Sequence, residues 1–169
     1  MSTNVIKCKS IIPQKVKNII NRYSKNDSSL TNFIYLLKNE FNIDATIDKD
    51  IVKSYERDYS NMPGKADALV RPCNDIECAI CLYTSHVFKI PITISAGRTN
   101  LNGSATPFEG IIFSTEKMIS PKVKVNFENN TVISPVGIPL ENMRNEIQSK
   151  TRKSTSKISR HACANLRTV

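Results

Sequence analysis

The sequence predicts an α+β fold, in which N-terminal helices precede a β-α-β unit and additional antiparallel strands. Three observations support this prediction. Apolar residues recur at helical spacing before residue 46, and two short apolar segments flank a capped helix between residues 68 and 94. Apolar and polar residues then alternate from residue 122 to residue 127. A chain of 169 residues with 40% hydrophobic side chains can bury one core of ordinary size.

The first part of the chain, residues 1–46, is predicted to be a helical lead. A short helix is expected after Pro13, and a second helix is expected after the potential N-cap at Ser28–Ser29. Asp48 is expected to cap a third, short helix just beyond the lead. The apolar faces of the first two helices are formed by Ile11, Ile12, Val16, Ile19 and Ile20, and by Leu30, Phe33, Ile34, Leu37 and Phe41.

The β-α-β unit follows the turn at residues 61–64. Residues 68–71 and 90–94 are expected to form its strands. Asn74 is expected to cap the helix between them, with Glu77 as its capping-box partner. The apolar face of this helix is formed by Ile76, Ala79, Ile80, Tyr83 and Val87.

The region after the unit is predicted to be a loop followed by strands and one helix. Ile111–Phe113 and residues 123–127 are expected to be strands, and the latter turns at Asn129–Asn130 into residues 131–134. A last helix is expected near Pro139. Residues 150–169 are rich in Ser, Thr and Lys, and we expect them to be a basic, disordered tail.

The loop after the second strand is the candidate binding site. Its small residues allow a close approach of the backbone to an anion, and its amides and hydroxyls can donate to phosphate oxygens. The loop has neither the Walker nor the Rossmann glycine spacing. A loop with only two glycines is more typical of a connection between strands that binds no ligand. The candidate cofactor-binding residues are Ser95, Ala96, Gly97, Arg98, Thr99, Asn100, Leu101, Gly103 and Ser104.

An ordered series of segments around this loop resembles the FAD-binding domain of the vanillyl-alcohol-oxidase (PCMH) type, which occurs in FAD-linked oxidases and dehydrogenases. The resemblance covers about residues 47–149, the predicted partial FAD-binding domain. The segments that carry it are Tyr55–Ser60, Ala68–Pro72, Asn74–Glu77, Ile90–Ala105, Gly110–Met118 and Thr131–Gly137.

The resemblance implies that the loop from Ser95 to Ser104 wraps the FAD pyrophosphate. Ser95 stands at a position that is usually basic in the family, and Arg98 stands where glycine is common. Some relatives attach FAD through a His in this loop. No His lies between residues 95 and 107, so FAD binding is expected to be non-covalent.

The implied activity is the oxidation of an alcohol or a 2-hydroxy acid of the D-lactate or glycolate type. The family's second half of the FAD domain and its substrate domain have no counterpart in this sequence. We therefore expect a fragment that is inactive alone, to which a second chain could supply the missing domains. The sequence identifies no catalytic residue.

The net charge of +9 raises an alternative function, a non-enzymatic nucleotide- or phosphate-binding module whose basic tail contacts nucleic acid. Residues 150–169 hold six basic and no acidic side chains, which leaves 18 basic against 15 acidic residues before them. No aromatic residue interleaves the tail's charges. This pattern favours a solvated tail and makes nucleic acid an unlikely partner.

The remaining signals are weak. Cys73, Cys78 and Cys81 match the spacing of three plant-type iron–sulfur ligands, but buried thiols are favoured and no metal site is predicted. Glu56 and Asp58 are interpreted as surface charges. The sequence contains no secretory signal and no apolar run of membrane-spanning length, which predicts a cytoplasmic protein.

Overall fold

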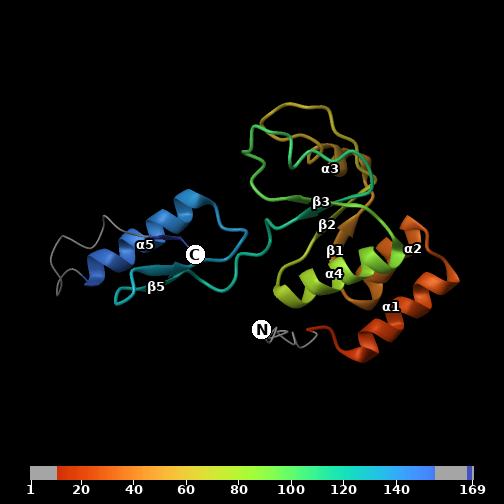
Figure 1. Cartoon of the computed structure of the whole chain (residues 1–169), viewed down its shortest axis with the longest axis horizontal. Coiled ribbons are helices and arrows are strands. Elements are labelled where there is room, and N and C mark those ends of the chain that lie inside the picture. The colour runs from red at the N-terminus through yellow and green to blue at the C-terminus, as the bar shows by residue number, and fades with distance from the viewer. Residues whose placement is uncertain (1–10, 155–166, 169) are drawn as a thin grey trace, which may run out of the picture.

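The computed structural model describes residues 11–154 and 167–168. Figure 1 shows two groups of elements along the chain. The first group contains four helices and a four-stranded sheet, and the second contains a small sheet with one helix. No helix within the described ranges is both long and apolar enough to cross a membrane.

The N-terminal helices form where the capping residues predict them. Helix α1 (Gln14–Asn26) begins directly after Pro13, and helix α2 (Leu30–Tyr35) begins after Ser29. The Ser29 hydroxyl accepts a 3.2 Å hydrogen bond from the amide of Asn32, which satisfies one of the free donors of the first turn. Helix α2 continues into a π-helical turn, η1 (Leu36–Glu40).

The main sheet has the strand order β1-β2-β4-β3. Strand β1 (Asp44–Thr46) runs antiparallel to β2 (Ala68–Arg71). Strand β4 (Ile111–Ser114) lies between β2 and β3 (Ile92–Ser95) and is parallel to both. The sequence predicts antiparallel strands after residue 95, and for β4 this prediction is wrong. Residues 96–110 carry the chain back to the edge of the sheet where β2 and β3 begin, as a parallel neighbour requires.

The two other helices of this group also follow the predicted caps. The Asp48 carboxylate accepts hydrogen bonds from two amides at the start of α3 (Lys49–Lys53). The Asn74 side chain accepts from the Glu77 amide at the start of α4 (Asp75–Phe88), and Glu77 accepts from the Cys73 amide. These two contacts fix the start of α4, and they differ from a capping box in that Glu77 binds the amide of Cys73 rather than that of Asn74.

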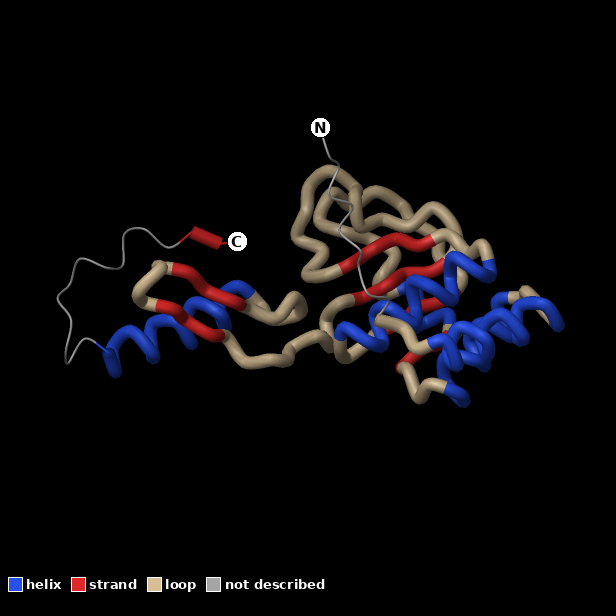
Figure 2. The backbone as a smooth tube through the Cα atoms, turned by 60° about the horizontal axis from the view of Figure 1, so that its bottom comes forward, coloured by secondary structure: helices blue, strands red, loops and turns tan. Residues whose placement is uncertain are grey.

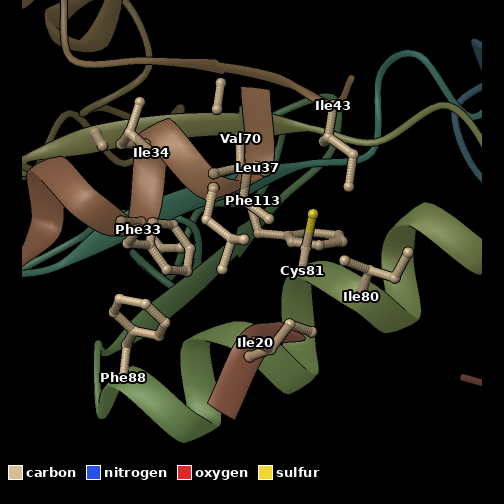
Figure 3. Packing of buried hydrophobic residues seen from close by; sticks show 14 residues of the cluster. Ile20, Phe33, Ile34, Leu37, Ile43, Val70, Ile80, Cys81, Phe88 and Phe113 are labelled. Atoms are coloured by element: carbon tan, nitrogen blue, oxygen red, sulfur yellow. The ribbon is translucent and has the colours of Figure 1, made fainter. Parts of the chain in front are cut away.

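Each face of the sheet carries its own apolar cluster. The larger cluster lies under α1, α2 and α4, and its packing is drawn in Figure 3. It joins Ile20 and Phe33 of the predicted helical lead to Val70 and Phe113 of the sheet. The smaller cluster, on the face covered by α3, consists of Val52, Tyr55, Leu69 and Ile112.

The C-terminal elements form a second small sheet. Strands β5 (Lys124–Asn126) and β6 (Thr131–Ile133) make the expected antiparallel hairpin, and β7 (Arg167–Thr168) pairs with β6 in parallel. Figure 2 shows helix α5 (Leu140–Ser154) alongside the hairpin. Helix α5 extends to Ser154 and strand β7 lies at Arg167–Thr168, so both include residues of the predicted basic tail over 150–169. Residues 155–166 and 169 lie outside the described residues.

The three cysteines of the predicted β-α-β unit differ in exposure. Cys73 is exposed, Cys78 is half-buried and Cys81 is buried within the larger apolar cluster. Burial raises the pKa of the Cys81 thiol far above its usual value. No group of three or more potential metal ligands forms among the described residues, and Cys8 and Cys163 lie outside them.

Candidate functional site

The candidate loop leaves the sheet at the carboxyl end of its parallel strands. Ser95, the last residue of β3, pairs in register with Ser114, the last residue of β4. Arg71 follows Val70, whose register partner is Phe113. Since side chains alternate along a strand, Arg71, Ser114 and Ser95 share the face of the sheet that α3 covers. The end of this face is thus a polar row, at an edge where ligands commonly bind in parallel sheets.

The loop is anchored to the segment that precedes β2. Figure 1 shows the two connections side by side near α3. The amide of Tyr59 donates a 3.0 Å hydrogen bond to the carbonyl oxygen of Arg98. The side-chain amide of Asn100 and, at 3.4 Å, the backbone amide of Ala105 both donate to the carboxylate of Asp58. Both ends of the loop are therefore held by residues 58–59.

Asp58 is the central acceptor of this arrangement. Its side chain is only 7% exposed. Our interpretation of Asp58 as a surface charge is therefore wrong, because two of its partners, Asn100 and Ala105, come from a loop more than 40 residues away in the sequence. The hydroxyl of Ser60, together with the amides of Ser60 and Ala105 and the side chain of Asn100, lowers the pKa of Asp58 against the opposing effect of burial. Glu56, the other presumed surface charge, is half-buried and accepts from the Ala66 amide at 2.9 Å.

Arg98 adopts an unusual backbone conformation. Its φ angle is +53°, in the left-handed region that favours glycine. This geometry gives a physical reason for a glycine preference at the position. The guanidinium carbon of Arg98 lies 4.2 Å from the ring centroid of Tyr55, in a cation–π contact. Its Nη1 is buried and makes no hydrogen bond within the described chain.

Tyr55 is hydrogen-bonded to a network of charged side chains that lie in β1 and β2 and just after β4. Its hydroxyl donates a 2.6 Å hydrogen bond to Glu116, which also lies 3.4 Å from the guanidinium of Arg71. Arg71 forms a 2.8 Å ion pair with Asp44, and Asp44 is paired with Lys117 as well. This network fixes the ring on which Arg98 rests.

The loop's own donors are largely free. Within the part of the chain that the structure describes, the backbone amides of residues 96–103 donate to no protein acceptor. The hydroxyl of Ser95 is buried and likewise has no partner there. Unpaired buried polar groups are uncommon in folded proteins and call for a ligand, water or ion as partner. A run of free backbone amides in a loop that also carries an arginine is suited to an anion.

The structure places the predicted site residues in three ways. Ser95 is buried at the end of β3, whereas Arg98, Asn100 and Gly103 are half-buried. The remaining residues are exposed along the loop: Ala96, Gly97, Thr99, Leu101 and Ser104. The side chains of Arg98 and Asn100 are brought to the 55–60 segment. Tyr55 and Asp58 were missing from the predicted site. Both belong to the Tyr-x-x-Asp-x-Ser pattern at residues 55–60, which is visible in the sequence.

Comparison with known proteins gives one curated relative and several structural neighbours. No family model matches the chain. Seventy-six residues, 44% of the chain, are 34% identical to the D-lactate dehydrogenase of Archaeoglobus fulgidus, and the match spans 17% of that protein.

Solved structures share the fold at low sequence identity. p-Cresol methylhydroxylase with bound substrate superposes with a TM-score of 0.59 and 19% identity, covering 83% of this chain and 26% of that one. The BBE-like 1 protein of Physcomitrella patens gives a TM-score of 0.58 and 11% identity, covering 72% and 26%. The predicted α+β fold is thus confirmed, and it matches part of the fold of p-cresol methylhydroxylase. The chain is thus distantly similar to a D-lactate dehydrogenase in sequence and to p-cresol methylhydroxylase in fold, in each case over a small part of that protein's length.

Proposed function

We propose that the chain binds FAD non-covalently and belongs to a flavin-dependent oxidoreductase. The observation that carries the proposal is the run of free amides at residues 96–103, in a loop that also holds the unpaired Nη1 of Arg98 and the unpaired hydroxyl of Ser95. A pyrophosphate presents many acceptor oxygens and two negative charges, and this set of donors suits it.

The proposed contacts divide between backbone and side chains. The exposed residues Ala96, Gly97 and Thr99 offer amides to the pyrophosphate, and Gly97 leaves room for it. A Cβ atom at Gly97 would meet only Thr99 Cγ2, at 3.9 Å. Arg98 adds positive charge from its position over Tyr55. The remaining proposed ligands are Asn100, Leu101, Gly103 and Ser104.

The cofactor supplies the redox chemistry when bound, since flavins accept hydride from carbon. The chain's part is to bind and orient the nucleotide. We assign no catalytic side chain within the described residues. The proposed division of the chain is a helical lead over 1–46, a partial FAD-binding domain over 47–149 and a basic tail over 150–169.

We infer that the substrate is an alcohol or a 2-hydroxy acid. The support is the local identity to a D-lactate dehydrogenase. The chain spans between about a sixth and a quarter of the lengths of the proteins it resembles, at 17% and 26%. Oxidation is therefore expected to require residues that those proteins hold outside the shared part, and these could come from a second chain.

A spectroscopic experiment tests the proposal. The purified chain is mixed with excess FAD, desalted and examined for flavin absorption, with circular dichroism as a check of folding. Retained flavin is expected for the natural chain, and its loss is expected for Gly97→Val. A Cβ atom at this position meets the protein only at Thr99 Cγ2, at 3.9 Å, and circular dichroism checks that the larger valine side chain leaves the fold intact. A folded chain that retains no flavin, but binds DNA with a steep salt dependence, would favour the alternative function.

A further inference from the structure

Asp58 is a buried carboxylate whose hydrogen bonds join two separate loops. It accepts from the amide and the hydroxyl of Ser60 within its own loop. It also accepts from the side chain of Asn100 and from the amide of Ala105 in the candidate loop. Four donors from two segments thus converge on one side chain that is 7% exposed.

All four of these donors are neutral groups. Among the described residues, no lysine, arginine or histidine forms an ion pair with Asp58. A buried carboxylate without a cation depends on hydrogen bonds to offset its lost hydration. The carboxylate therefore constrains the positions of Asn100 and Ala105 strongly.

A negative charge at this place cannot be explained by attraction to an anionic ligand. Asp58 contacts the same loop whose amides at 96–103 are free, so its charge repels a phosphate bound there. The benefit of the carboxylate must be geometric if the loop binds an anion. The Asp58 carboxylate accepts hydrogen bonds from the Ala105 amide and the Asn100 side chain, and the backbone amides of residues 96–103 stay available to a ligand.

We propose that Asp58 is a positioning residue, which holds residues 98–105 in the conformation that presents the free amides to the ligand. The proposal rests on the proposed function in assigning the ligand to this loop. Asparagine is not an adequate substitute, since its amide group would face donors that need acceptors. Only one of its two terminal atoms can accept a hydrogen bond.

The test compares two variants that remove the same charge. Asp58→Asn alters the loop contacts, whereas Glu109→Gln removes an exposed carboxylate that makes no hydrogen bond or ion pair in the described chain. Electrostatics alone predicts that both variants bind ADP more tightly. Positioning predicts that Asp58→Asn weakens ADP binding about tenfold through lost preorganisation, while Glu109→Gln binds as tightly or more tightly. Isothermal titration calorimetry at fixed ionic strength separates the two results.

A second measurement needs no ligand and separates this proposal from the proposed function. Amide hydrogen exchange, followed by NMR, should be faster at Tyr59 and Ala105 in Asp58→Asn, with core strands β2 and β4 unchanged. Asn100→Ala, which removes one of the four donors, should give a smaller effect in the same direction. If the natural chain fails to bind ADP, the proposed function is contradicted, and the exchange data still decide on Asp58. Unchanged exchange at Tyr59 and Ala105, or ADP binding by Asp58→Asn as tight as by Glu109→Gln, would overturn the inference.

Discussion

The guanidinium of Arg98 rests on the aromatic ring of Tyr55, which belongs to the smaller apolar cluster. This contact joins the candidate loop to the face of the sheet that α3 covers. It also gives a non-glycine residue a reason to tolerate a φ angle of +53°. The contact energy of a cation–π pair, about 0.5–1 kcal/mol at an accessible site, is similar to the backbone cost of the left-handed conformation, about 1–2 kcal/mol.

Replacement of Arg98 separates these two contributions. Arg98→Ala loses the cation–π contact and keeps the strained backbone, whereas Arg98→Gly loses the contact and relieves the strain. We expect the glycine variant to be more stable than the alanine variant by about 1 kcal/mol in urea unfolding. Both variants should bind ADP more weakly than the natural chain and with a shallower salt dependence. An alanine variant as stable as the glycine variant would contradict the strain assigned to Arg98.

The hydroxyl of Tyr55 is expected to contribute to stability. Tyr55→Phe removes the hydrogen bond to Glu116 and keeps the ring under Arg98. The expected loss is about 1 kcal/mol of unfolding free energy, as for a typical intramolecular hydrogen bond. Tyr59→Phe is the matched control, because Tyr59 is 75% exposed and its hydroxyl makes no hydrogen bond in the described chain. Equal effects of the two substitutions would show that the Glu116 contact contributes nothing.

Two glycines should respond differently to the addition of a methyl group. Gly110 has a φ angle of +70°, and a Cβ atom there would lie 2.3 Å from the carbonyl oxygen of Pro91. Gly110→Ala must move backbone atoms before β4 and is expected to cost more than about 2 kcal/mol in thermal or urea unfolding. Gly97→Ala adds only an ordinary van der Waals contact with Thr99 Cγ2, at 3.9 Å, and should change stability little. A Gly110→Ala variant of unchanged stability would mean that the turn into β4 differs from the one described.

Asp44 links stability to pH. Burial acts to raise the pKa of Asp44, but the hydrogen bonds and charges of Lys117 and Arg71 outweigh it and lower that pKa. A folded-state pKa below the unfolded value of about 3.9 stabilises the protein above that pH, and the contribution is lost as the pH falls through the folded pKa. The stability difference between the natural chain and Asp44→Asn should therefore be constant from pH 7 to pH 5. It should shrink below about pH 4, as urea titrations at each pH can show. A difference that persists at pH 2 would contradict this assignment.

Local signals in the sequence predicted most of the elements. Proline, serine and aspartate caps located the starts of α1, α2 and α3, and Asn74 with Glu77 located α4. Each of these signals acts within one turn of helix, so it can be recognised without knowledge of the rest of the fold. Strand β1 was missed although Ile43, Ala45 and Ile47 alternate with polar residues, because three residues are too short for a convincing pattern.

The errors concern contacts between distant segments. The place of β4 between β2 and β3 depends on the pairing of residues more than 15 positions apart, which periodicity cannot reveal. The burial of Asp58 depends on Asn100 and Ala105 in the same way. The loop itself could be found from its small residues, but the segment that holds it could not be identified as its support without the fold.

The most direct test of the account is a pair of calorimetric titrations of the natural chain, one with ADP and one with adenosine. The two ligands differ only in the pyrophosphate, which is the group assigned to the loop at residues 95–104. We predict that ADP binds at least about tenfold more tightly than adenosine, a difference of about 1.4 kcal/mol, and that the difference shrinks at high salt. Equal affinities for the two ligands, or no binding of ADP by a folded chain, would contradict the assignment of the loop as a pyrophosphate site.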